Sequence, residues 1–166
     1  MPRDVPFEGA GDALFDRGPD PDKPLLWLAH GHRSISAARE VLADRLGVEV
    51  VTLKLVDTRF YHLDTCFCPL EGGYAMYFPP AFDDASRALI EARVPAAKRI
   101  EIAEEDALAF ACNAVNIDAT VVVNRATPAF VKALAAKKFE VVQTPLSEFM
   151  KAGGSAKCLT LRLDEP

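Results

Sequence analysis

Short segments of strand character alternate with short segments of helical character along this chain, and that alternation most constrains its fold. Apolar or β-branched runs at 24–30 and 48–55 flank a segment, 36–46, whose apolar residues recur at helical spacing before Gly47. Alternation of this kind favours an α/β fold. By the same criteria we predict further strands at 60–67, 73–78, 98–102, 120–124, 139–143 and 157–163, and helices at 82–92, 104–111, 128–137 and 145–151.

Length and composition are those of one globular domain, residues 1–166, with half of the residues hydrophobic and about a quarter charged. The formal net charge is −5 and no Lys/Arg cluster occurs, which argues against nucleic acid and anionic membranes as partners. No apolar run is long enough to span a bilayer, and the first residues, MPRD, do not resemble a signal peptide. We therefore expect a cytoplasmic protein.

A candidate nucleophile lies near the C-terminus, where the segment GGSAKC (153–158) brings Cys158 to the start of the predicted strand 157–163. A glycine-rich loop that leads into a strand would hold the thiol on rigid backbone beside open space, as a nucleophile requires. The alternative is a small apolar residue that fills the core, because free cysteine is among the most buried residue types.

His62 and Asp64 form a second candidate pair. They are two residues apart, so on the predicted strand 60–67 both side chains would project from one face. A histidine beside a carboxylate can transfer protons, although a surface pair of little energetic value is the alternative.

Glu8 lies in a third segment, FEGAGDAL (7–14), whose glycines permit tight backbone and close approach by a ligand. Asp12 in the same segment is expected to hold the glycine turn.

Four segments, taken in order, resemble the guanidine-modifying superfamily of arginine deiminases, dimethylarginine dimethylaminohydrolases, amidinotransferases and arginine dihydrolases. The family pattern is Glu-Gly-(Gly)-Asp, then Gly-x-x-Arg-(Thr/Ser), then His-Leu-Asp or His-Leu-Lys, and finally a cysteine. Here these segments read FEGAGD (7–12), GHRS (31–34), HLD (62–64) and GSAKC (154–158). The resemblance spans essentially the whole chain and implies a partial, pentein-like α/β propeller built of ββαβ units.

The position of the glutamate motif departs from the family pattern, in which a substantial segment precedes it and supplies an aspartate that grips the guanidinium. Here Glu8 comes almost at the start of the sequence. We therefore expect the C-terminal portion of such a propeller, lacking the family's N-terminal segment. A homo-oligomer, or a partner that supplies the missing units, is then expected.

The resemblance also implies residue roles. Cys158 would attack the guanidine carbon, His62 would protonate the leaving amine and later deprotonate water, and Glu8 would bind the guanidinium or support His62. Asp64 would bind a guanidino nitrogen, and Arg33 the α-carboxylate of the substrate. The implied activity is a cysteine-dependent hydrolase that acts on arginine or methylated arginine through a covalent thiouronium intermediate and gives a citrulline-type product.

Other interpretations stay open at this point. The chain could be an amidinotransferase, a non-catalytic remnant that binds a ligand or partner, or a cysteine peptidase using Cys158 and His62. We expect a small guanidine as the ligand, and neither a metal nor another cofactor. Cys66 and Cys68 near His62 do not have the spacing of a zinc knuckle and are expected to pack in the core. Asn113 is expected to help shape the site.

Overall fold

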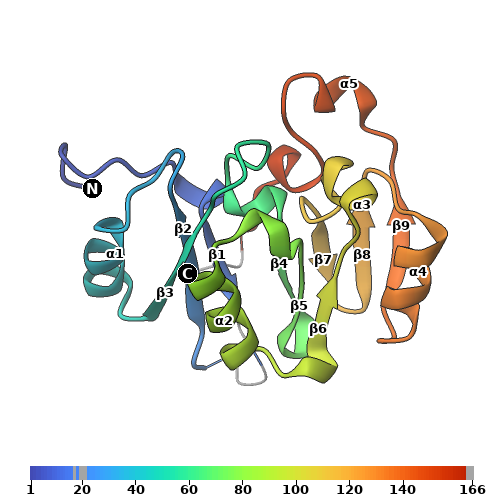
Figure 1. Ribbon diagram of the computed structural model, residues 1–166, viewed down its shortest axis with the longest axis horizontal. Coiled ribbons are helices and arrows are strands. Elements are labelled where there is room, and N and C mark those ends of the chain that lie inside the picture. The colour runs from blue at the N-terminus through green and yellow to red at the C-terminus, as the bar shows by residue number, and fades with distance from the viewer. Residues whose placement is uncertain (17, 19–21, 164–166) are drawn as a thin grey trace.

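The computed structural model describes residues 1–16, 18 and 22–163, which form three small three-stranded sheets (Figure 1). Helices cover the sheets from outside, and no helix of the described residues is long and apolar enough to cross a membrane. The sheets are, in chain order, β1 (Ala13–Asp16), β2 (Leu25–His30) and β3 (Glu49–Lys54); β4 (Phe67–Leu70), β5 (Tyr74–Tyr77) and β6 (Arg99–Glu101); and β7 (Val115–Ile117), β8 (Thr120–Val123) and β9 (Glu140–Gln143).

Each sheet repeats one topology. Its first strand pairs antiparallel with the second, and the second pairs parallel with the third. A parallel connection needs a crossover, which α1 (Ala38–Leu46), α2 (Asp84–Arg93) and α4 (Pro128–Ala135) provide. The ββαβ unit therefore occurs three times in the described part of the chain. Two shorter helices, α3 (Glu104–Leu108) and α5 (Ser147–Met150), follow β6 and β9.

Local side-chain bonds fix the ends of these helices. Asp83 accepts a hydrogen bond from the backbone N–H of Ser86 at 2.9 Å at the start of α2, and Thr127 accepts one from Phe130 at 3.2 Å at the start of α4. Gly47 ends α1 in the left-handed conformation, with φ of 66°, that glycine adopts without strain. These caps explain why the predicted helix positions are close to those observed.

One continuous hydrophobic core joins the three units, running from Leu14 in the first to Leu134 in the third. Trp27 is completely buried and its ring lies 5.1 Å from that of Phe67 in the second unit. Its indole N–H donates to Asp16 at 2.9 Å, so the polar atom of this large side chain is satisfied. The units thus pack as parts of a single body.

Polar contacts also cross the boundaries between units, where an isolated antiparallel bridge pairs Leu55 with Phe82 although the three-stranded ladders themselves are separate. The backbone N–H of Lys54 donates to Ser86 Oγ at 2.8 Å, which ties β3 to α2. Between the second and third units, the N–H of Glu71 donates to the side chain of Asn116 at 2.7 Å. The shared hydrophobic core and these polar contacts together dock the sheets against one another.

The predicted strand at 60–67 is wrong over most of its length. Residues Leu63–Thr65 form a 3-10 turn, and β4 begins only at Phe67. Thr65 Oγ1 donates to the carbonyl of His62 at 2.7 Å, a local bond of the kind that competes with strand pairing. His62 and Asp64 consequently do not share a strand face.

The predicted strand at 157–163 is also wrong. Lys157–Leu159 forms a 3-10 turn, so Cys158 lies in this turn and not at the start of a strand. The N–H of Lys157 donates to the carbonyl of Asn113 at 3.1 Å, and that of Thr160 to the carbonyl of Lys157 at 3.0 Å. A strand needs a neighbour that takes up its backbone groups, and none of the described segments pairs with this one.

Two neighbouring residues of α2 provide a test of the shared core. Ile90 is fully buried, whereas Leu89 is 38% exposed. We expect Ile90→Ala to lower the free energy of unfolding by about 2–5 kcal/mol, because it leaves a cavity in the shared core. The matched control Leu89→Ala should cost less than about 1 kcal/mol. Urea unfolding of both variants measures the difference, and equal losses would contradict this packing.

Candidate active site

The buried carboxylate of Asp12 joins three of the sequence motifs. It accepts a hydrogen bond from Ser34 Oγ at 2.6 Å and another from the backbone N–H of Leu63 at 3.1 Å. Ser34 Oγ in turn accepts from the N–H of Glu8 at 3.1 Å. Burial raises the pKa of Asp12, and the Ser34 bond opposes that rise. Asp12 therefore does more than hold the glycine turn, because it sets the His62 segment beside the Glu8 segment.

Glu8 and His62 meet directly: Oε2 of the glutamate lies 2.8 Å from Nε2 of the imidazole. A Cβ on Gly11 would lie 2.5 Å from His62 Nδ1, so the close approach of this ring requires glycine there. The hydrogen bond from His62 lowers the pKa of Glu8, which keeps the carboxylate ionised beside the ring. The ionised carboxylate therefore fixes the orientation of the imidazole ring.

Arg33 lies at the rim of this pair. Its Nη1 is 3.5 Å from Glu8 Oε1, its side chain is half-exposed, and its guanidinium lies 5.5 Å from the centre of the Tyr61 ring. A weakly held, exposed guanidinium remains available to a carboxylate from solvent.

Cys158 differs from the other three cysteines, which are buried, because it is exposed. Burial raises the pKa of Cys68 to about 12 and that of Cys66 and Cys112 well above the usual range, so these thiols stay protonated. The loop before Cys158 is anchored by the Tyr61 hydroxyl, which donates to the carbonyl of Gly153. The accessible thiol is thus the one that the sequence singled out.

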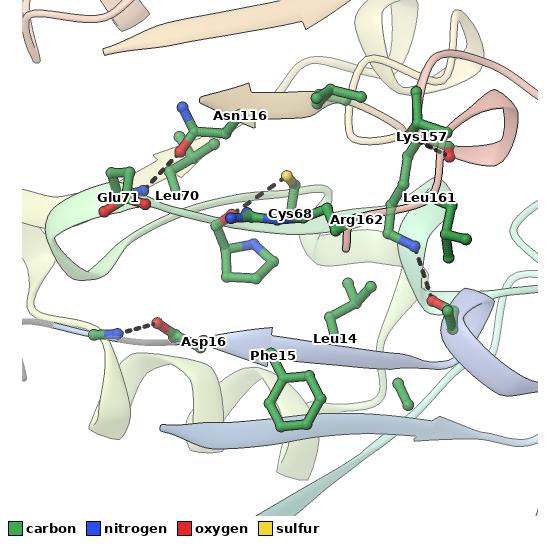
Figure 2. A pocket seen from close by; sticks show the side chains of 17 residues that line it. Leu14, Phe15, Asp16, Cys68, Leu70, Glu71, Asn116, Lys157, Leu161 and Arg162 are labelled. Carbon is green, nitrogen blue, oxygen red and sulfur yellow. Dashed lines mark hydrogen bonds between the residues drawn. The ribbon is translucent and has the colours of Figure 1, made fainter. Parts of the chain in front are cut away.

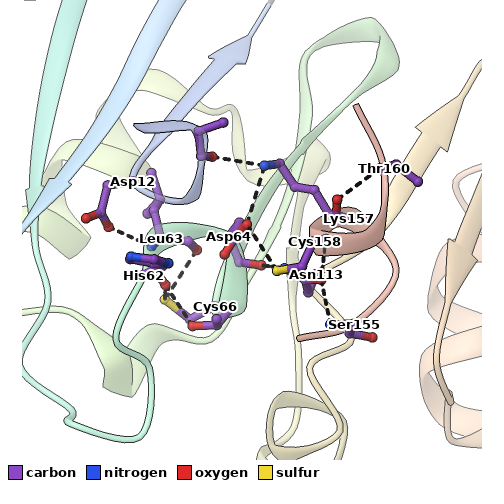
Figure 3. A network of polar contacts seen from close by, with 12 residues as sticks. Asp12, His62, Leu63, Asp64, Cys66, Asn113, Ser155, Lys157, Cys158 and Thr160 are labelled. Atoms are coloured by element: carbon purple, nitrogen blue, oxygen red, sulfur yellow. Dashed lines mark hydrogen bonds and ion pairs between the residues drawn. The ribbon is translucent and has the colours of Figure 1, made fainter. Parts of the chain in front are cut away.

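Asn113 lies directly beneath this thiol (Figure 3). Its Nδ2 is 3.1 Å from Cys158 Sγ, and its Oδ1 accepts from the backbone N–H groups of Ser155 at 3.2 Å and Cys158 at 3.1 Å. The prediction that Asn113 helps shape the site agrees with this position.

Asp64 lies on the other side of Cys158, almost completely buried. Its Oδ2 is 3.8 Å from Cys158 Sγ and 3.4 Å from Lys157 Nζ, whereas Oδ1 has no hydrogen-bond partner within the described residues. Burial raises the pKa of Asp64, and Lys157 opposes that rise. A buried carboxylate oxygen that lacks a donor is a group to which a ligand N–H can bind.

A cavity opens beside this cluster (Figure 2). Lys157 lines it and also donates from Nζ to the carbonyl of Ala10 at 2.9 Å, so its ammonium group lies where the cavity meets the polar cluster. The remaining walls come from the first strand of each unit and the C-terminal segment, including Leu14, Asp16, Leu70, Glu71, Asn116 and Leu161.

The five residues that the sequence nominated form two contacting groups: Glu8 contacts both His62 and Arg33, and Asp64 adjoins Cys158. Lys157 links the two groups, because its Nζ contacts both Ala10 and Asp64. Lys157 and Tyr61 were not predicted as members. Lys157 directly precedes Cys158 in sequence, and Tyr61 directly precedes His62, which is the signal that could have indicated them.

Comparison with known proteins gives consistent relatives. The bifunctional arginine dihydrolase/ornithine cyclodeaminase AgrE of Nostoc is 54% identical over the whole chain, which covers 23% of that protein. The N(G),N(G)-dimethylarginine dimethylaminohydrolase of Mycobacterium tuberculosis is 42% identical over 156 residues, 94% of this chain and 49% of the relative. The chain therefore spans half or less of the length of these proteins.

Among solved structures, the substrate-bound N-terminal domain of the cyanobacterial arginine dihydrolase ArgZ superimposes with a TM-score of 0.95 at 53% identity. It matches all of this chain, which covers 60% of that domain chain. A family model described as N,N dimethylarginine dimethylhydrolase, eukaryotic, matches residues 2–164. The chain therefore belongs to this dimethylarginine dimethylhydrolase family.

Proposed function

We propose that this chain carries the reacting residues of a hydrolase that attacks the guanidine carbon of arginine through Cys158. One observation carries the proposal: the exposed thiol lies 3.8 Å from the buried carboxylate of Asp64, whose second oxygen has no partner in the described part of the chain. That oxygen can accept N–H donors of a guanidinium whose carbon faces the sulfur. The similarity to arginine dihydrolases at 54% identity favours arginine over its methylated derivatives.

The first half-reaction forms a bond between Cys158 Sγ and the guanidine carbon. That carbon is a weak electrophile because its positive charge is delocalised, so a thiolate nucleophile and a charge-localising carboxylate are both needed. Asp64 supplies the carboxylate. His62 gives a proton to the departing nitrogen, and the C–N bond breaks. Ammonia departs, and the guanidine carbon stays bonded to Cys158 Sγ as a covalent thiouronium.

The second half-reaction consumes water. Neutral His62 takes a proton from the water, whose oxygen bonds to the same carbon, and the C–S bond breaks to return the thiolate of Cys158. The ureido group releases its remaining proton to solvent, so the product is citrulline. Glu8, 2.8 Å from His62 Nε2, holds the imidazole in position at each stage. Arg33 is placed to bind the α-carboxylate of the substrate.

Turnover of arginine tests this function. We expect the protein, assayed with the subunits or partner that complete its site, to release citrulline and ammonia from arginine, and Cys158→Ser to lower kcat by at least about a thousandfold, as loss of a nucleophile does. Acid quenching during turnover should trap a Cys158 peptide whose added mass is arginine less ammonia. Asymmetric dimethylarginine serves as the second substrate, and faster release of dimethylamine than of ammonia would contradict the assignment to arginine.

Thiol labelling tests the nucleophile without turnover. We expect chloroacetamidine to modify Cys158 before Cys66, Cys68 or Cys112, because those three are buried and their raised pKa values keep them protonated. Peptide mapping by mass spectrometry identifies the modified residue. In urea all four should react, and earlier labelling of any buried cysteine in the folded protein would contradict the assignment.

The buried carboxylate predicts a pH dependence of stability. Since the pKa of Asp64 is raised on folding, the folded protein keeps this proton to higher pH than the unfolded chain, and stability falls as pH rises through that interval. Asp64→Asn removes the titration. We therefore expect the variant to gain stability relative to the wild type as pH rises from about 4 towards neutral. Urea unfolding across this range measures the difference, and a constant offset would contradict the prediction.

A further inference from the structure

Asn113 makes more contacts with the proposed nucleophile than any role in packing requires. Asn113 is fully buried and lies in the segment between α3 and β7. Its side chain and backbone together form hydrogen bonds with three residues of the loop that carries Cys158. Its backbone carbonyl accepts from Lys157 N–H at 3.1 Å, and its side-chain oxygen accepts from the N–H groups of Ser155 and Cys158.

The orientation of the Asn113 amide follows from these partners. Ser155 and Cys158 present backbone N–H groups, which can only donate, so the atom that faces both must be the oxygen. The nitrogen must then face the sulfur, 3.1 Å away, and the carbonyl of Asp64, 3.4 Å away. A donor is therefore aimed at Cys158 Sγ by geometry that the amide cannot reverse without losing two hydrogen bonds.

We propose that Asn113 is a positioning residue that donates a hydrogen bond to Cys158 Sγ and fixes the direction of its attack; this inference rests on the function proposed above. An N–H donor stabilises an anionic sulfur more than a neutral thiol, which is a weak acceptor. Because Asn113 is completely buried, water cannot replace its N–H from below the sulfur. Asn113 Nδ2 also donates to the backbone carbonyl of Asp64, which fixes the position of Cys158 relative to the carboxylate proposed to bind the guanidinium.

The variant Asn113→Asp distinguishes donation of an N–H to the sulfur from a role in which Asn113 only holds the cysteine loop in place. The carboxylate keeps acceptors for Ser155 and Cys158 but removes the donor and places negative charge beside the sulfur. We expect the rate of Cys158 alkylation by iodoacetamide at neutral pH to fall about tenfold or more. If Asn113 only anchored the loop, this variant would react as the wild type does.

Asn113→Ala is the second variant, in case the aspartate disturbs folding. It removes the donor without adding charge, and we again expect slower alkylation. Loss of an anchor alone would loosen the loop and leave the rate unchanged or higher, which would overturn the proposal. Circular dichroism confirms that each variant is folded before alkylation is measured.

Asn124→Asp is the matched control. Asn124 is a similar bridging amide that accepts from Leu146 N–H at 2.7 Å and donates to the carbonyl of Ala109 at 3.3 Å, away from any cysteine. Its alkylation profile should equal that of the wild type. Alkylation is measured without any guanidine, so it is independent of arginine hydrolysis. If the Asn113 variants react more slowly but the wild type does not hydrolyse arginine, the proposed function is contradicted and the role of Asn113 at the thiol is not.

Discussion

The arrangement of the polar cluster depends on the buried carboxylate of Asp12. Removing a carboxylate from water is unfavourable unless donors replace the lost hydration, and here Ser34 and the backbone of Leu63 do so. Because these donors come from two segments far apart in sequence, satisfying Asp12 also fixes where those segments lie. Glu8 and His62 meet as a result, and the glycine at position 11 leaves room for the ring.

Charge is arranged around the thiol so that a cation is favoured there. Asp64 and Glu8 are the acidic side chains of the cluster. Lys157 forms an ion pair with one carboxylate oxygen of Asp64, and the other oxygen has no donor in the described structure. A site of this kind is costly in the unliganded protein, and a bound guanidinium would relieve that cost.

The sequence was a good guide where a pattern reflects local preference. Helices such as α2 and α4 are marked by their caps, and the longer strands by apolar runs. Strands β1 and β7 were not predicted, and the segments 60–67 and 157–163 have strand-like patterns but bond locally instead. Motif order nominated the cluster, whereas Lys157 and Tyr61 contribute through contacts that exist only in the folded chain.

Glu8 precedes the first unit, His62 lies between the first and second, and Cys158 follows the third, so the cluster depends on how the three units dock (Figure 1). Each unit can remain internally paired while it shifts slightly against its neighbour. Displacements of about an ångström are enough to impair a reacting geometry. Heat inactivation should therefore begin at temperatures where every helix and sheet is still intact, which makes the docking of the units, and not their secondary structure, the limit on working temperature.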